Sequence, residues 1–155
     1  MEREVMDIYC DGSGFSGINS AYCIIALHNG KKKKRIIKVI DDNLNSGEIE
    51  YIALIKALEF AKTIPEYKIK IFTDRISILD AIHNVKEENR GMYLKAVFLL
   101  KDENIDIYWT PRNRNIAGIE LEKRLEKLHN YANCSAHIKS LTKKQRRNKY
   151  LRLHR

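Results

Sequence analysis

The sequence lacks the features that mark secreted and membrane proteins. No apolar run approaches the ~20 consecutive residues that a membrane-spanning helix needs. The first residues, MEREVMDIYC, have no basic start and too short an apolar stretch to resemble a signal peptide. We therefore expect a cytoplasmic protein.

Cysteine is scarce as well. The three cysteines, Cys10, Cys23 and Cys134, are odd in number, and none belongs to a C-x-x-C pair. Disulfide frameworks need an even set of cysteines, and structural zinc sites use closely spaced pairs. The sequence thus predicts neither kind of site, and we expect all three thiols to be reduced.

Acidic residues are absent from the end of the chain. Residues 139–155 contain no acid and hold eight of the 29 Lys and Arg residues, which leaves 21 basic against 20 acidic residues in 1–138. The net charge of +9 therefore belongs to a tail, with a second basic cluster at Lys31–Arg35. Such a distribution favours a polyanionic partner, of which nucleic acid is the common case. A solubilising tail or a localisation signal remains the alternative. The tail residues that we expect to bind nucleic acid are Lys143, Lys144, Arg146, Arg147 and Lys149.

Two periodicities divide the rest of the chain, whose 155 residues suit a single domain with one core. Apolar runs bounded by turn residues predict strands at Val5–Cys10, Asn19–Leu27, Arg35–Ile40, Lys68–Thr73 and Ile105–Trp109. Helical patterns predict one helix between Gly47 and Pro65 and three more at Ile76–His83, Gly91–Lys101 and Ile116–Ala132. The order βββαβααβα predicts an α/β fold, with a five-stranded mixed sheet flanked by helices. We place this domain at residues 1–136 and the basic tail at 137–155.

Three acids stand at the ends of these predicted elements. Asp11 and Asp74 follow the first and fourth strands, and Glu50 opens the first helix. Taken singly, each acid suits a turn, a helix cap or a partner for the helix dipole. Three converging carboxylates, however, repel one another unless they hold a cation. Oxygen ligands without His or Cys favour Mg²⁺ or Mn²⁺ over zinc.

Four blocks of sequence give the acids a family context. They read I-Y-C-D-G-S-G, E-Y-I-A-L-I-K-A-L, I-F-T-D and Y-W-T-P-R-N-R-N. Together they resemble type 1 ribonuclease H, in particular its reverse-transcriptase-like branch, over roughly residues 5–130. The resemblance implies a ribonuclease H-like fold and two-metal cleavage of the RNA strand of RNA/DNA hybrids. It also implies that Asp11, Glu50 and Asp74 are catalytic metal ligands. Glu48 lies close by, but Glu50 has the matching register to Ala53-Leu54.

The last block departs from the family pattern R-x-x-N-x-x-A-D. Its Arg112, Arg114 and Asn115 fit the pattern, and we expect these three residues to contact nucleic acid. The expected Ala-Asp pair is replaced by Gly118-Ile119, so the fourth carboxylate is missing from its usual place. Glu120 and Glu122 are the candidates to replace it. We choose Glu122, because it lies about 60° around a helix from position 119, whereas Glu120 lies about 100° away.

Three functions remain open at this point. The leading hypothesis is a magnesium- or manganese-dependent endonuclease that cleaves the RNA strand of RNA/DNA hybrids. The second is a non-catalytic nucleic-acid-binding subunit of a ribonucleoprotein, anchored by its basic tail. The third is a nuclease of the same fold with another substrate, such as a DNA junction. Retention of three mutually repelling acids favours an enzyme, and loss of the fourth favours the subunit.

Overall fold

The computed structural model describes residues 2–14, 20–40, 44–78, 95–96 and 98–140. The chain divides into two compact units, Met1–Leu121 and Glu122–Arg155. The first unit holds the sheet. None of the helices in the described ranges is long and apolar enough to cross a membrane.

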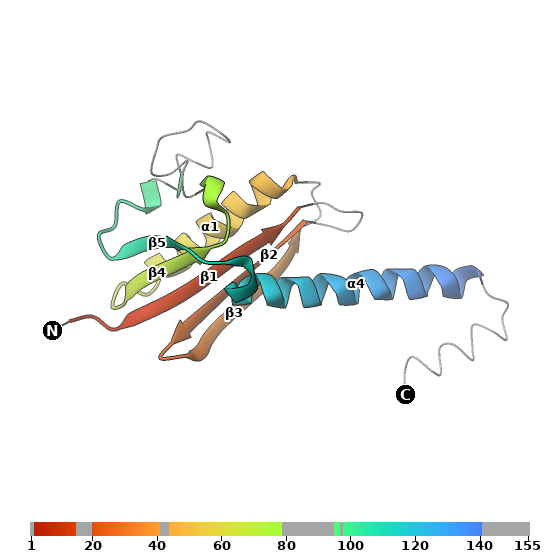
Figure 1. Ribbon diagram of the computed structural model, residues 1–155, viewed down its shortest axis with the longest axis horizontal. Coiled ribbons are helices and arrows are strands. Elements are labelled where there is room, and N and C mark those ends of the chain that lie inside the picture. Colours follow the sequence, from red (N-terminus) through yellow and green to blue (C-terminus); the bar gives the residue numbers. More distant parts are fainter. Residues whose placement is uncertain (1, 15–19, 41–43, 79–94, 97, 141–155) are drawn as a thin grey trace. The chain divides into compact units, whose positions relative to one another are not determined.

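The sheet begins with a three-stranded antiparallel meander (Figure 1). Its strands are β1 (Val5–Ser13), β2 (Ser20–His28) and β3 (Lys31–Ile40). The turn between β2 and β3 is Asn29-Gly30, and both residues have positive φ angles, 51° and 76°. That conformation suits glycine and asparagine better than other residues. The five basic residues that open β3, Lys31–Arg35, are all exposed.

Two parallel strands complete the sheet. They are β4 (Lys68–Thr73) and β5 (Ile105–Trp109), and the strand order is β3-β2-β1-β4-β5. β1 is therefore the central strand, antiparallel to β2 and parallel to β4. All five predicted strands are present, but β3 begins four residues earlier than predicted, and β1 continues to Ser13, so Asp11 lies within the strand and does not follow it. The predicted α/β, ribonuclease H-like class is confirmed.

The helix α1 (Ser46–Lys62) packs against one face of the sheet (Figure 1). It begins with a capping box, in which Asn45 Oδ1 accepts a hydrogen bond from the Glu48 N–H and Glu48 accepts one from the Asn45 N–H. Its apolar side joins alternate residues of β1, β2 and β4 in the main core, for example Ile8, Ile24 and Ile71. Because side chains alternate along a strand, the other residues of β1 point to the opposite face.

The chain after β5 forms a short 3₁₀ helix, η1 (Arg112–Arg114), and a long helix, α4 (Ile116–Ser140). α4 extends eight residues beyond the predicted end at Ala132. Residue 136, after which we placed the domain boundary, lies within α4, and the division into a domain and a basic tail remains a prediction. Of the predicted helices Ile76–His83 and Gly91–Lys101, only residues 76–78, 95–96 and 98–99 are described as helical. Residues 100–101 form a turn, and residues 79–94 and 97 lie outside the described residues.

Candidate metal centre

The register between β1 and β4 brings two of the predicted acids together. Tyr9 on β1 pairs with Phe72 on β4, and Asp11 and Asp74 each follow two residues later. Because the two strands are parallel, both acids lie at the same edge of the sheet and on the same face as that aromatic pair. The Tyr9 and Phe72 rings stack with their centroids 4.8 Å apart.

Glycine in the D-G-S-G motif lets α1 approach that edge. A Cβ atom placed on Gly12 would lie 2.7 Å from the carbonyl oxygen of Ile49 and 3.0 Å from the Glu50 nitrogen. One placed on Gly14 would lie 2.6 Å from the backbone nitrogen of Ser46. Both contacts are too short for any residue with a side chain. The two glycines therefore allow the first turns of α1 to lie directly against β1, which carries Glu50 to Asp11.

The three carboxylates form one cluster. Asp11, Glu50 and Asp74 each offer an oxygen atom within 4.8 Å of the others. Burial, and then the charges of Asp74 and Glu50, raise the pKa of Asp11 from 3.8 to about 7. Burial also raises the pKa of Glu50, and the Arg75 guanidinium opposes that rise. Glu48, the alternative considered from the sequence, takes part in the capping box instead.

The donor set fits a hard divalent cation. All three ligands are carboxylates, which Mg²⁺ and Mn²⁺ prefer. Glu50 Oε2 is buried and makes no hydrogen bond within the described structure. The Arg75 guanidinium lies 3.0 Å from this oxygen, and a metal ion bound there would satisfy the buried acceptor. The cluster could therefore bind a metal ion, as the sequence predicted.

Asn115 connects the acidic cluster to α4. Its side chain is fully buried, and its Nδ2 donates hydrogen bonds to the Cys10 carbonyl at 3.0 Å and to Asp74 Oδ2 at 3.2 Å. Its Oδ1 accepts a hydrogen bond from the Ala117 N–H at 3.2 Å, which caps the start of α4. We expected this residue to contact nucleic acid. That contact remains a prediction; in the structure the buried side chain instead holds Asp74, through hydrogen bonds that join residues distant in sequence.

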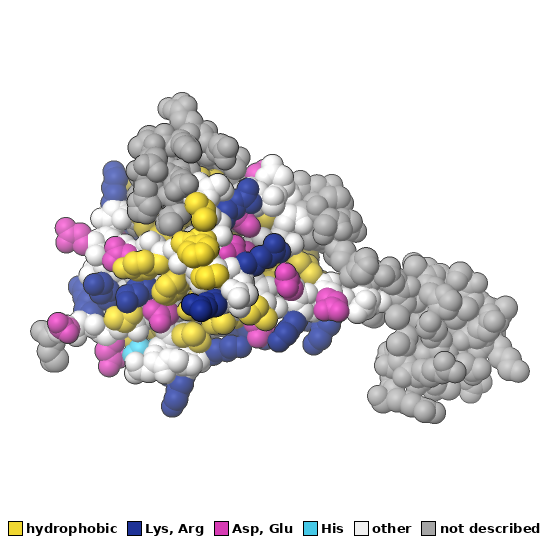
Figure 2. All heavy atoms as spheres, in the orientation of Figure 1, with side chains coloured by type: hydrophobic (Ala, Val, Ile, Leu, Met, Phe, Trp, Pro, Cys, Tyr) yellow, Lys and Arg dark blue, Asp and Glu magenta, His cyan; other side chains and the backbone are white. Residues whose placement is uncertain are grey.

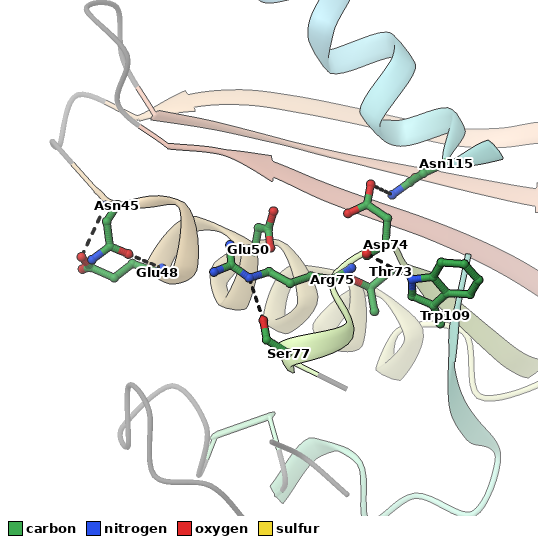
Figure 3. A network of polar contacts seen from close by, with 9 residues as sticks. All are labelled: Asn45, Glu48, Glu50, Thr73, Asp74, Arg75, Ser77, Trp109 and Asn115. Carbon is green, nitrogen blue, oxygen red and sulfur yellow. Dashed lines mark hydrogen bonds and ion pairs between the residues drawn. The ribbon is translucent and has the colours of Figure 1, made fainter. Parts of the chain in front are cut away.

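Two further residues at the cluster were not predicted. Arg75 extends from the end of β4 toward α1, where its Nη1 lies 3.0 Å from Glu50 Oε2 (Figure 3). Trp109, at the end of β5, donates a hydrogen bond from Nε1 to the Asp74 carbonyl at 3.2 Å. The family blocks assign no metal-binding role to either residue, so the sequence gave no reason to select them. For Arg75, its place directly after Asp74 was the available hint.

The start of α4 approaches the cluster from the other side. A Cβ atom on Gly118 would lie 2.8 Å from Asp11 Oδ2, so the absence of a side chain there lets the helix contact Asp11. Ile119, at the position where the pattern has Asp, is 38% exposed. Glu120 pairs with Lys32 at 3.1 Å and Arg35 at 3.3 Å on β3. Glu122 is exposed on α4 and belongs to the second unit, so its predicted role as the fourth ligand remains a prediction.

The predicted nucleic-acid contacts fall in two places. Arg112 and Arg114 are exposed on η1. The five tail residues from Lys143 to Lys149 lie outside the described residues. On the face drawn in Figure 2, the Lys and Arg side chains are interspersed with acidic and apolar ones. That mixture agrees with the nearly balanced charge of residues 1–138.

Comparison with known proteins places this fold in a class. The structure resembles RNase H1 from Halobacterium salinarum, with a TM-score of 0.68 and 21% identity over 79% of this chain and 98% of that one. It also resembles the N-terminal RNase H domain of rv2228c from Mycobacterium tuberculosis, with a TM-score of 0.65 and 16% identity over 81% and 99%. LC11-RNase H1, isolated from compost and solved with an RNA/DNA hybrid, gives a TM-score of 0.63 and 19% identity over 75% and 92%. These likenesses define a ribonuclease H-like fold.

The sequence itself assigns the family. A family model described as reverse transcriptase-like matches residues 10–125, about three quarters of the chain. The chain belongs to this reverse transcriptase-like, ribonuclease H-related family, as its motifs predicted. A comparison with curated protein sequences found no significant match.

Proposed function

We propose that the protein is a metal-dependent endonuclease that cleaves the RNA strand of RNA/DNA hybrids. The observation that carries this proposal is the convergence of Asp11, Glu50 and Asp74 at one edge of the sheet. Three mutually repelling, half-buried carboxylates are unfavourable for stability unless a cation holds them together. A scaffold that only presents a nucleic-acid surface has no use for such a cluster.

The three acids would hold Mg²⁺ or Mn²⁺. When bound, such metal ions supply an activated water and stabilise the oxygen that leaves the cleaved phosphate. Asn115 holds Asp74 through Nδ2 and so fixes the orientation of one ligand. Arg112 and Arg114, exposed on η1, would contact phosphate groups of the nucleic acid.

The substrate is proposed from the relatives. LC11-RNase H1 was solved with an RNA/DNA hybrid, and so was the foamy viral protease-reverse transcriptase, which this chain resembles with a TM-score of 0.58. We extend this substrate class to the present chain. The expected localisation is cytoplasmic.

The test is a cleavage assay with labelled RNA/DNA hybrid, double-stranded RNA and double-stranded DNA, each with Mg²⁺, Mn²⁺ or EDTA. We expect cleavage of the RNA strand in the hybrid with either metal and none with EDTA. Asp74→Asn is the negative control for a contaminating nuclease. Cleavage of duplex DNA alone would instead favour a nuclease with another substrate, and no cleavage at all would contradict the proposal.

The second candidate is a non-catalytic nucleic-acid-binding subunit of a ribonucleoprotein. Ile119 favours it, because an apolar side chain stands where the family pattern has its fourth acid. In this case the basic tail carries the binding. A chain ending after His137 would then bind RNA far more weakly, and the log-log salt slope would shrink by up to ~0.9 for each duplex phosphate that the tail no longer neutralises. A full-length protein that binds hybrid but never cleaves it would support this candidate.

A further inference from the structure

Arg75 places a positive charge inside the proposed metal site. It follows Asp74 directly, and its side chain turns back to α1, where Nη1 lies 3.0 Å from Glu50 Oε2. The Glu50 side chain is only 14% exposed, so the pair is largely shielded from water on the acid's side. The contact is not aligned as a hydrogen bond, and Oε2 makes none elsewhere in the described structure. The guanidinium therefore neutralises Glu50 without saturating its oxygen.

Neighbouring residues hold Arg75 in this position (Figure 3). Its Nε donates a hydrogen bond to Ser77 Oγ at 3.0 Å, and its backbone N–H donates one to Thr73 Oγ1 at 3.3 Å. The preceding carbonyl, that of Asp74, accepts the hydrogen bond from Trp109. The turn that carries Arg75 is thus fixed on both sides, and the direction of its side chain is part of the fold.

A guanidinium and a divalent cation cannot both bind the Glu50 carboxylate at full strength. Each is attracted to the same buried oxygen, and the two positive charges repel each other at short range in a site of reduced dielectric constant. We propose that Arg75 is a built-in counter-ion that competes with the metal for Glu50. This inference rests on the proposed metal site and adds to it a residue that sets metal affinity.

Competition predicts that removal of Arg75 lowers the stability of the metal-free protein and raises its affinity for the metal. Without metal, Arg75 offsets the repulsion among Asp11, Glu50 and Asp74, so its removal lowers stability. With metal, the cation performs that task, and the absence of Arg75 strengthens binding. A purely structural arginine would instead lower stability by the same amount in both states.

The experiment compares Arg75→Gln with the wild type, using Mn²⁺ alone as the probe and no nucleic acid. Free Mn²⁺ is followed by electron paramagnetic resonance during titration, and the melting temperature is measured in EDTA and in saturating Mn²⁺. Arg75→Lys keeps the charge. Arg3→Gln is the matched control, because it removes the same charge from an exposed position. An extended chain from Arg3 to Asp11 spans about 26 Å, so Arg3 lies far from the cluster.

We expect Arg75→Gln to bind Mn²⁺ tighter by roughly fivefold, the upper range for a partly exposed ion pair. Its melting temperature should fall in EDTA and show a larger rise on metal addition than the wild type. Arg75→Lys should stay nearer the wild type, and Arg3→Gln should match it. Equal or weaker Mn²⁺ binding by Arg75→Gln would overturn the competition while leaving the metal site intact. If neither protein binds Mn²⁺, the proposed function fails as well.

Discussion

The candidate metal centre has two sides that follow the family pattern to different degrees. On the sheet side, β1, α1 and β4 supply three carboxylates, and two glycines give α1 the room to deliver Glu50. On the helix side, the start of α4 supplies Gly118 and Ile119 where the pattern has Ala and Asp. Glu120, the next acid along, pairs with Lys32 and Arg35 on β3.

The difference follows from how each side is built. The sheet side depends on strand register and on a close backbone approach, so its geometry follows once the core has formed. The helix side depends on single side chains at the surface of α4, which can change without disturbing the fold. The fold therefore brings the three carboxylates together, whereas the residues at the start of α4 can depart from the family pattern.

The largest effect is expected on the sheet side, from Asp74→Asn. Removing one of three like charges should raise the melting temperature in EDTA, because repulsion within the cluster is relieved. The rise on addition of millimolar Mg²⁺ or Ca²⁺, which the wild type should show, should disappear together with cleavage. Asp106→Asn, an exposed acid on β5, is the matched control. A wild type with no metal-dependent shift would contradict the metal site.

Gly12→Ala should be the next most damaging change. The new methyl group would stand 2.7 Å from the Ile49 carbonyl oxygen, which belongs to the backbone and cannot rotate away. Overpacking of this kind costs about 1–3 kcal/mol, and here it also moves Glu50 away from Asp11. Urea denaturation and Mg²⁺-dependent melting should both report the change. Gly30→Ala, in the open hairpin turn, should leave the Mg²⁺ response intact although its positive φ strains the turn. Unaltered metal binding in Gly12→Ala would contradict the role given to this glycine.

The sheet side was largely predictable from the sequence, for reasons that Asp11 and Asp74 illustrate. Apolar alternation located the strand that carries Asp11, and the same pattern located β4 before Asp74. Family blocks then identified the acids, because motif spacing reflects the elements that carry them. The helical register also separated Glu50 from Glu48, which the structure places in the cap of α1.

The helix side was predicted less well, because its contacts join residues far apart in the chain. Asn115 reaches the Cys10 carbonyl, 105 residues away, and its burial cannot be read from its neighbours in sequence. The pairing of Glu120 with Lys32 likewise spans 88 residues. The end of α4 was placed too early because the residues after Ala132 have weak apolar periodicity.

Gly118→Ala would sharpen the contrast between the two sides. A Cβ atom there would lie 2.8 Å from Asp11 Oδ2, the far end of a short side chain, so the carboxylate can yield while the backbone stays in place. Alanine also favours a helix over glycine by up to about 1 kcal/mol. We therefore expect unchanged or slightly higher stability in EDTA but weaker Mn²⁺ binding, measured by titration. A loss of stability without a change in Mn²⁺ affinity would mean that Gly118 serves only helix packing.

The smallest effect is expected from Glu122→Gln, which tests whether α4 supplies a replacement for the fourth acid. Side chains on a helix lean toward its N-terminus, so helical geometry predicts that Glu122 leans back toward position 118, where glycine has no side chain. Glu120 is the matched control, since its ion pairs with β3 occupy it elsewhere. If the protein cleaves hybrid, Glu122→Gln should lower the cleavage rate severalfold and leave hybrid affinity unchanged, while Glu120→Gln should retain the rate. Equal rates in the two variants would reject the replacement and leave a site of three carboxylates.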